Sequence, residues 1–186
     1  MLADVPTRCP EIVEAITAAV KNDRATSLAA ALAGLLATGA LDDARLYLDP
    51  RPGHYSRNLI WRDPANRFVV VGMSWGAGQG SPLHDHDGLW GGEIVVSGTM
   101  SETRFRLLER EETSRYRFSA DQGRLSSRGS VGMLVPPLEY HNFRNAGDSV
   151  ARTVHVYGGD LAQAQMFTHE TGEWYRAKQI TLTYDA

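Results

Sequence analysis

Apolar residues recur at helical spacing near the start of the chain. Ile12, Ile16 and Val20 follow one another four residues apart, in an Ala- and Leu-rich segment that runs from Pro10 to about Leu48. The same spacing returns further along, at Leu28, Leu32, Leu35 and Leu36. Residues three and four apart share one side of a helix. The pattern therefore predicts two or three short helices in this segment.

The pattern changes after Gly53 to short β-rich runs. Six of them are RFVVVGMSW, GEIVVSGTM, ETRFRLLE, SRYRFSA, GSVGMLVP and VARTVHVYG, and Gly, Pro, Asn and Asp punctuate them. A further plausible strand lies around Gln179 to Thr183. Runs of this kind are typical of strands joined by turns. The sequence thus predicts a mainly β fold, an antiparallel barrel or sandwich behind a helical N-terminus.

Length and composition are those of one domain. A chain of 186 residues that is 42% hydrophobic can bury one good core. The sequence contains no low-complexity linker and no internal repeat of useful length. We therefore expect a single domain over residues 1–186, in which a helical segment, 1–48, packs on a β-barrel formed by residues 54–186.

Charge and cysteine content narrow the class of partner. The formal net charge of −3 gives no long-range attraction to nucleic acid or to an anionic membrane. Cys9 is the only cysteine, and no apolar stretch approaches the roughly 20 residues that span a bilayer. We expect a cytoplasmic protein with a small-molecule ligand, with neither nucleic acid nor membrane as partner. The absence of a coiled-coil pattern favours a monomer.

Three histidines form a candidate metal site. His84 and His86 lie two residues apart after a Gly-rich turn, and on a strand such residues point to the same face. His141 follows two prolines in PPLEYHNFRN. The spacing of the two segments resembles the two motifs of the cupin superfamily, whose barrel brings them together. We therefore predict that His84, His86 and His141 hold the metal.

The usual fourth ligand of that superfamily is missing. A glutamate is expected five residues after His86, where this chain has Gly91, and Glu93 is displaced from that position by two residues. Three neutral imidazoles suit zinc, copper or iron. Zinc would imply hydrolysis or hydration, whereas iron with one open face would let a substrate and oxygen bind side by side. The three histidines alone do not distinguish these metals, so the choice depends on residues outside the triad.

A longer resemblance decides in favour of iron. The stretch HYSRNLIWRDPANRFVVVGMSWGAGQGSPLHDHDG resembles the cysteine dioxygenase family, as do SGTMSETRF, EYHNFRN and TVHVYGG, so the similarity runs from about Tyr47 to Gly172. It implies a cupin (double-stranded β-helix, or jelly-roll) barrel that binds Fe(II). It also implies a thiol dioxygenase that adds both atoms of O₂ to a small carboxylated thiol to give a sulfinic acid, here L-cysteine to cysteine sulfinic acid.

The resemblance also implies substrate-binding residues. An arginine in a YxRN segment grips the substrate carboxylate in this family, and Tyr55-Ser56-Arg57-Asn58 matches that segment. Arg57 is thus the expected clamp, because a guanidinium fork can bind a carboxylate in a bidentate way, and Tyr55 is expected to assist. Trp75 and Leu83 are expected to line the pocket wall.

A catalytic relay is implied as well. The family carries a Ser-His-Tyr relay whose tyrosine hydroxyl reaches the bound ligands, and Thr153, His155 and Tyr157 occupy the matching positions. Strand alternation places these three on one face. In animal members a cysteine crosslinks to the relay tyrosine, but the aligned residue here is Gly91, so no such crosslink can form.

Several alternatives remain open at this point. Trp90 resembles bacterial relatives that oxidise mercaptocarboxylic acids, but relatives that prefer 3-mercaptopropionate carry glutamine in place of Arg57. A 3-mercaptopropionate or mercaptosuccinate dioxygenase is therefore the main enzyme alternative. A cupin that binds a metal or ligand without turnover is another. A third is a zinc or manganese isomerase or hydrolase: the absent glutamate counts against manganese, and the matches at Arg57 and Tyr157 count against both metals.

Overall fold

The computed structural model describes residues 9–21, 24–112 and 114–185. Two α-helices open the fold, α1 (Pro10–Lys21) and α2 (Arg24–Ala37). Two short 3₁₀ turns follow, η1 (Ala40–Asp42) and η2 (Ala44–Leu46). The helical segment predicted from the apolar spacing is confirmed. None of the helices in the described part of the chain is long and apolar enough to cross a membrane.

The rest of the regular secondary structure in the described part of the chain consists of strands. Their bounds are β1 (Ser56–Arg62), β2 (Val69–Trp75), β3 (Gly80–His84), β4 (Gly91–Ser97), β5 (Thr99–Arg110), β6 (Arg115–Ala120), β7 (Arg124–Ser127), β8 (Val131–Leu134), β9 (His141–Asn145), β10 (Ala151–Tyr157), β11 (Gln163–Thr171) and β12 (Trp174–Thr181).

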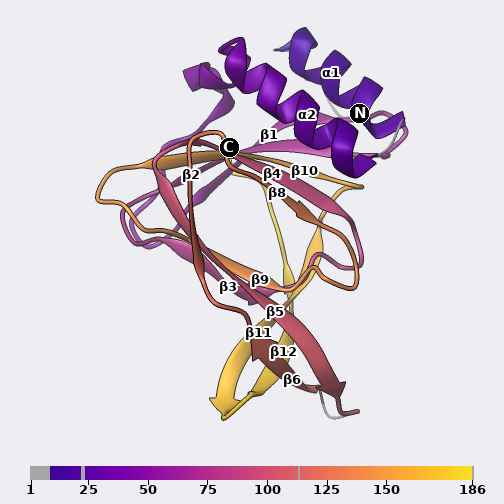
Figure 1. Cartoon of the computed structure of the whole chain (residues 1–186), viewed down its shortest axis with the longest axis vertical. Helices are drawn as coiled ribbons and strands as arrows, with labels where there is room; N and C mark the ends of the chain where they lie inside the picture. The colour runs from indigo at the N-terminus through magenta and orange to yellow at the C-terminus, as the bar shows by residue number, and fades with distance from the viewer. Residues whose placement is uncertain (1–8, 22–23, 113, 186) are drawn as a thin grey trace.

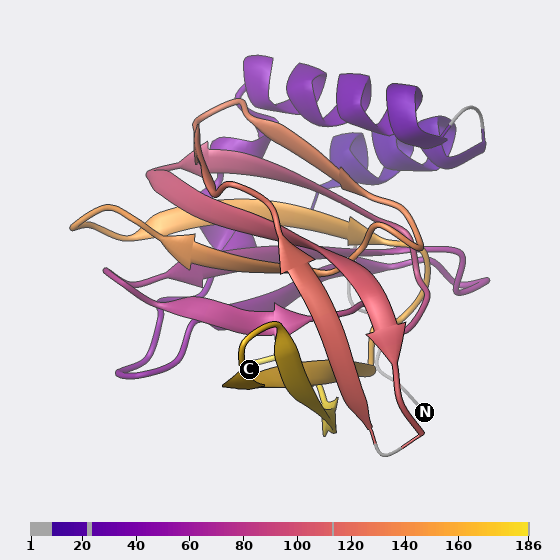
Figure 2. The ribbon, with the colours of Figure 1, turned by 60° about the horizontal axis from the view of Figure 1, so that its bottom comes forward.

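The strands form two antiparallel sheets. One has the order β1-β2-β10-β4-β8 and the other the order β6-β12-β11-β3-β9-β5-β7. In Figure 1 the two helices lie against the five-stranded sheet, and the second sheet lies on its other side. Figure 2 shows the same layers from a second direction, with the helices again on the outer side. The predicted mainly β cupin barrel with N-terminal helices is confirmed by this arrangement.

The central strands of the five-stranded sheet, β2, β10 and β4, are buried on both faces, which explains their unbroken hydrophobic runs. All seven residues of β2 are buried. Val70 and Val156 point outward into a core cluster that they share with helix residues such as Ile16 and Leu32. Met73 and Tyr157 belong to the cluster on the inner side. Side chains therefore alternate between the helical layer and the barrel interior.

Glycine permits the close approach of α2 to the sheet. A Cβ atom at Gly92 on β4 would lie only 2.7 Å from Leu28 Cδ2. Leu28 and Leu32 are fully buried in the cluster between helix and sheet. The sequence thus uses a residue without a side chain where the two layers meet, and the helices cover the outside of the barrel.

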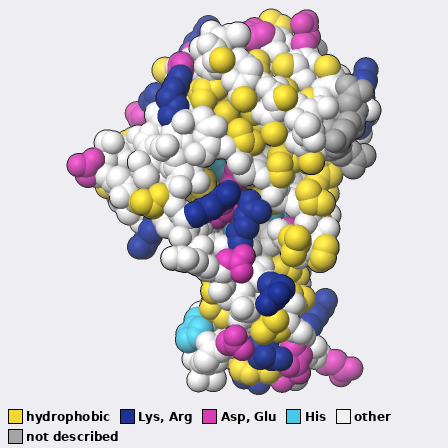
Figure 3. All heavy atoms as spheres, in the orientation of Figure 1, with side chains coloured by type: hydrophobic (Ala, Val, Ile, Leu, Met, Phe, Trp, Pro, Cys, Tyr) yellow, Lys and Arg dark blue, Asp and Glu magenta, His cyan; other side chains and the backbone are white. Residues whose placement is uncertain are grey.

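The far end of the second sheet has its own stabilisation. Phe105, Tyr116, Phe118 and Phe167 form an aromatic cluster there. Salt bridges join strands on the surface: Arg115 of β6 pairs with Glu170 of β11, across β12, and Arg117 of β6 pairs with Glu109 of β5. Figure 3 shows acidic and basic side chains intermixed over this end of the molecule. Exposed pairs of this kind contribute little each, so the aromatic cluster is the main packing at this end.

Candidate metal centre and pocket

Three histidines converge where β3 meets β9. His84 ends β3 and pairs in register with His141, the first residue of β9. His86 lies two residues beyond His84, and one ligating nitrogen of each of the three histidines lies within 4.8 Å of the other two. Their ring centroids are 4.9 to 5.2 Å apart. The fold thus brings together two segments that are more than fifty residues apart in the sequence.

Hydrogen bonds orient two of the imidazoles. His84 Nδ1 lies 3.0 Å from the carbonyl oxygen of Pro82, and His141 Nδ1 lies 3.3 Å from Glu102 Oε1. Burial opposes ionisation of Glu102, but the hydrogen bond from His141 and the charge of Arg104 outweigh it and lower the Glu102 pKa to about 2. Both acceptors therefore fix the proton on Nδ1, which leaves the Nε2 lone pair available to a metal.

The charge state of the triad suits metal binding. Burial, followed by the neighbouring His141, lowers the pKa of His84 to about 3. Burial and the neighbouring His84 and His141 hold the pKa of His86 well below its usual value. Neutral imidazole is the form that binds a metal. The three side chains thus fit a transition metal ion that accepts nitrogen ligands.

Glu93 and Asp85 face away from this triad. The carboxylate of Glu93 groups with Glu102 and His141 and not with His84 or His86. Asp85 Oδ1 accepts hydrogen bonds from the backbone N–H groups of Gln165 and Asp87. The bond from Gln165 attaches Asp85, which lies between His84 and His86, to β11.

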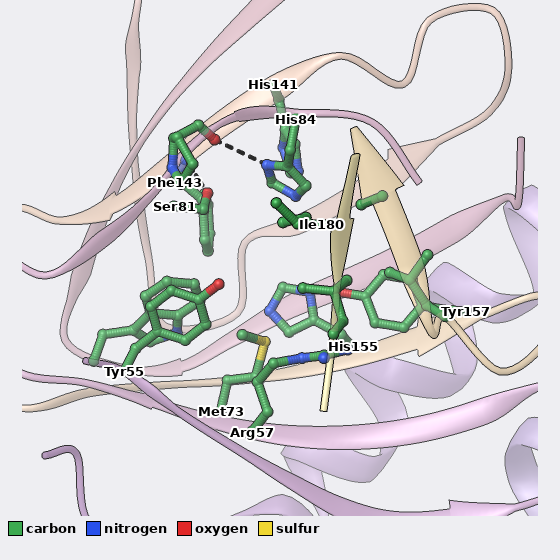
Figure 4. A pocket seen from close by; sticks show the side chains of 15 residues that line it. Tyr55, Arg57, Met73, Ser81, His84, His141, Phe143, His155, Tyr157 and Ile180 are labelled. Atoms are coloured by element: carbon green, nitrogen blue, oxygen red, sulfur yellow. Dashed lines mark hydrogen bonds between the residues drawn. The ribbon is translucent and has the colours of Figure 1, made fainter. Parts of the chain in front are cut away.

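A pocket opens beside the histidines inside the barrel. Figure 4 shows His84 and His141 at one end, with Arg57, Met73 and His155 across from them. Of the residues predicted from the sequence, it is lined by Tyr55, Arg57, Trp75, His84, His141, His155 and Tyr157. Its apolar wall includes Met73, Phe143, Leu161, Ala164, Ile180 and Leu182.

Arg57 is a buried cation with a free donor that borders the pocket. Its side chain projects from β1, and the residue is only 5% exposed. Nη1 donates to the carbonyl oxygen of Thr183 at 3.1 Å, and the guanidinium carbon lies 5.1 Å from the centre of the Tyr184 ring. Nη2 is buried and has no hydrogen-bond partner among the described residues. Buried donors of this kind normally have an acceptor, and a ligand in the pocket could supply it.

The three predicted relay residues lie in one hydrogen-bonded chain. Trp75 Nε1 donates to Thr153 Oγ1 at 2.9 Å, Thr153 Oγ1 lies 2.8 Å from His155 Nε2, and His155 Nδ1 lies 3.2 Å from Tyr157 Oη. Burial raises the pKa of Tyr157 well above its usual value, so the phenol keeps its proton. The chain ends at a hydroxyl group on the pocket wall.

Leu83 and Trp90 both lie away from the pocket, although Leu83 was expected to line it. Leu83 is adjacent to His84 on β3, so its side chain points to the other face of the strand, where it packs with Phe167 in the aromatic cluster. Trp90 packs against the core under the helices, and a Cβ at Gly158 would lie 2.2 Å from its ring. Trp90 is not among the residues that line the pocket.

Sequence reasoning missed most of the apolar wall. Met73 could have been found, because it lies two residues before Trp75 on a predicted strand and shares its face. Ile180 and Leu182 come from the end of the chain, and no local pattern indicates that this end folds over the pocket. Their position depends on the pairing of β11 with β3 and β12.

Comparisons with known proteins found one matching family model and several similar solved structures. The model of the family described as cysteine dioxygenase type I matches residues 17–170. Among solved structures, TT1209 from Thermus thermophilus is 19% identical, with a TM-score of 0.45 over 62% of this chain and 91% of that one. A conserved protein with a double-stranded β-helix domain from Klebsiella pneumoniae is also 19% identical, with a TM-score of 0.46 over 71% and 91%.

Proposed function

The chain belongs to the cysteine dioxygenase type I family, and on that premise we propose that it is a ferrous-iron thiol dioxygenase acting on L-cysteine. The reaction is RS⁻ + O₂ → RSO₂⁻. Both oxygen atoms end on sulfur, and every electron that sulfur loses is taken up by O₂, so no external reductant is needed. The product is cysteine sulfinic acid.

The observation that carries this proposal is the free donor of Arg57 in the same pocket as the histidines. Arg57 Nη2 is buried without a partner among the described residues, and both Arg57 and His84 line the pocket. A small acid bound there could place its carboxylate on Nη2 and its thiol beside the triad. Arginine binds carboxylates in a fixed geometry, so a single pose is favoured.

Each group of the chain has a separate task in this reaction. A ferrous ion held by His84, His86 and His141 would supply the adjacent coordination positions and the redox chemistry. Arg57 neutralises and orients the carboxylate, which fixes the position of the sulfur. Tyr157 keeps its proton and can donate a hydrogen bond to the reacting atoms. The apolar wall limits the entry of water.

The placement of Trp90 supports cysteine over a mercaptocarboxylic acid. The likeness to relatives that use such acids rested on Trp90, but this side chain packs under the helices, away from the pocket. Arg57, by contrast, lines the pocket. The preference for L-cysteine therefore rests on Arg57, which lines the pocket, and not on Trp90, which lies outside it.

The proposal is tested by oxygen consumption. Protein loaded anaerobically with iron is given L-cysteine, 3-mercaptopropionate or mercaptosuccinate, and the products are identified by mass spectrometry. Uptake with L-cysteine and formation of cysteine sulfinic acid is the expected result. Uptake with only one of the other thiols would keep the reaction class and replace the substrate.

Zinc-loaded protein is the matched control, because the same three histidines can hold zinc, which has no redox chemistry. It should consume no oxygen with any thiol. If the protein with one iron bound per chain were equally inactive, the thiol dioxygenase proposal would be wrong, and a cupin that binds a metal or ligand without turnover would take its place.

A further inference from the structure

Glu93 is a buried acid that the proposed reaction does not use. It lies on β4 directly opposite His155 of β10, and the next inward position of β4, Gly91, lies opposite Tyr157. Glu93 is 3% exposed, and its Oε2 has no hydrogen-bond partner within normal distance among the described residues. The same oxygen lies 3.5 Å from His155 Nδ1. An acid is costly to bury unless its oxygens find a donor, and His155 is the donor within reach.

The hydrogen bonds on the other side of His155 fix where its proton lies. An indole N–H can only donate, so Thr153 Oγ1 accepts from Trp75. The single hydroxyl proton of Thr153 is then free to be donated to His155 Nε2, 2.8 Å away. Burial, followed by the nearby His141 and Arg57, lowers the pKa of His155 to about 3, so the ring is neutral. A neutral ring that accepts at Nε2 carries its proton on Nδ1.

The position of that proton determines where the hydroxyl of Tyr157 points. The Nδ1–H group of His155 faces both Tyr157 Oη, at 3.2 Å, and Glu93 Oε2, at 3.5 Å. A protonated Nδ1 cannot accept from Tyr157, so the phenol proton is left for the pocket that Tyr157 lines. In the opposite tautomer, Tyr157 would donate to Nδ1, and the pocket would lose this donor.

We propose that Glu93 is a positioning residue that accepts from His155 Nδ1 and holds this tautomer, so that the hydroxyl proton of Tyr157 stays directed at the substrate or at O₂. The effect of Glu93 on turnover rests on the proposed function. The tautomer itself does not, and it can be measured in protein that holds no iron.

The surroundings of Glu93 assign it to His155 and not to the metal ligands. Glu93 also clusters with His141 and Glu102, but Glu102 already accepts from His141 Nδ1 at 3.3 Å and is itself paired with Arg104 and Arg124. The neighbouring strand β8 also makes room for Glu93. A Cβ atom at Gly132 would lie 2.7 Å from Glu93 Oε1, so the absence of a side chain there leaves room for the carboxylate.

Nitrogen NMR of the zinc-loaded full chain, labelled with ¹⁵N-histidine, tests the tautomer directly. Long-range ¹H–¹⁵N correlations show which ring nitrogen carries the proton, and the His155→Gln spectrum assigns the signals. Wild-type protein should show His155 protonated at Nδ1. Glu93→Leu, which removes the acceptor at similar size, should shift the proton wholly or partly to Nε2. Glu93→Gln should keep the wild-type pattern, because its amide oxygen can still accept.

Asp63→Asn is the matched control, because Asp63 is another buried acid, bonded to Arg67 in the turn between β1 and β2. It should lower thermal stability without changing the His155 signals. An Nε2-protonated His155 in the wild type, or an unchanged tautomer in Glu93→Leu, would overturn the proposal. If Glu93→Leu does not fold, Glu93→Met removes the acceptor with a more flexible side chain.

Steady-state kinetics of iron-loaded protein provide the second readout. Glu93→Leu should lower kcat roughly tenfold or more through the misdirected proton of Tyr157, with an unchanged KM for the thiol because Arg57 is untouched. Glu93→Gln should stay close to wild type. A wild type without oxygen uptake would remove the proposed function and leave the NMR result standing, whereas an active wild type with an equally active Glu93→Leu would overturn the role of Glu93.

Discussion

Arg57 is the residue whose loss should affect substrate binding most. Its Nη2 is the free buried donor of the pocket among the described residues, and lysine lacks the planar fork that binds a carboxylate at two points. We expect Arg57→Lys to raise KM for L-cysteine by roughly 10- to 100-fold, as follows from the loss of one charged hydrogen bond. The value of kcat should change less. An unchanged KM, measured in an oxygen electrode, would contradict the carboxylate clamp.

Tyr157 should affect the chemical step and not binding. Its hydroxyl ends the chain that begins at Trp75. Tyr157→Phe keeps the ring but removes the donor, so kcat should fall by roughly 100-fold, as is typical of a lost general acid. KM for the thiol should remain within a few-fold of wild type. If kcat were unchanged, Tyr157 would be a packing residue only.

Burial of neutral histidines should make the metal-free protein sensitive to mild acid. The His155 pKa is about 3 in the fold and about 6.5 in an unfolded chain. The unfolded state therefore binds more protons below pH 6.5, and this part of the stability is lost as pH falls toward 3. The melting temperature should thus fall more between pH 7 and 5 for wild type than for His155→Gln. An equal fall in melting temperature between pH 7 and 5 for the two proteins, measured in a thermal-shift assay, would contradict this prediction.

Single residues were predictable from the sequence where chemistry or alternation marks them. The spacing of the HDH triplet was enough to single out His84 and His86, whereas Arg57 was predicted only through the resemblance of the YSRN segment to a known family. The mistake at Leu83 was avoidable, because a residue next to His84 on a strand must face the other way. Glu93 could not be paired with His155, since that contact depends on the register between β4 and β10.

At the scale of elements, residues 182–185, which follow β12, hold Arg57 in position. Thr183 accepts from its side chain, Tyr184 packs on the guanidinium group, and Asp185 accepts from its backbone N–H at 2.8 Å. Leu182 of the same segment lines the pocket. Residues 182–185 thus contribute to the pocket and to the surroundings of Arg57, although they form no strand and carry no motif.

Tyr184→Leu should show this dependence. It removes the ring that packs on Arg57 and the hydrogen bond from Tyr184 Oη to Asp160, but it leaves the three histidines unchanged. We expect KM for the thiol to rise several-fold, since a cation–π contact contributes roughly 1 kcal/mol, while iron content per chain stays constant. A variant at an aromatic far from the pocket, Trp174→Leu, should leave KM unchanged. The same KM in both variants would argue against positioning by Tyr184.

Element types were easier to predict than their pairing. The spacing of apolar residues was enough to predict the helices in residues 10–48, and the β-rich runs correspond to strands. The last strand was placed around Gln179 to Thr183, whereas β12 spans Trp174–Thr181. The order of strands in the sheets joins segments far apart in the chain, such as β3 and β11. Local patterns contain no information on such pairs.

At the scale of the whole molecule, the helices and the barrel share one core. Leu32 of α2 is fully buried in the cluster that also contains Val154 and Val156 of β10, and the inner face of β10 carries Thr153, His155 and Tyr157. The helical layer therefore stabilises the strand that bears the relay, without touching the pocket. We expect helices and barrel to unfold together, in a single transition, as is usual for a small domain.

Leu32→Ala tests this coupling. It should lower the free energy of unfolding by about 2–5 kcal/mol, the usual cost of a large cavity in a core. The loss should appear equally in far-UV circular dichroism, which reports helices and strands, and in the fluorescence of a Trp61→Phe, Trp90→Phe and Trp174→Phe background, in which Trp75 inside the barrel is the one remaining tryptophan. The kinetic constants at 25 °C should stay near those of wild type, because no pocket residue is changed. Two separate transitions would mean that the helical layer is an independent unit, and the barrel would then have to hold the relay strand by its own contacts alone.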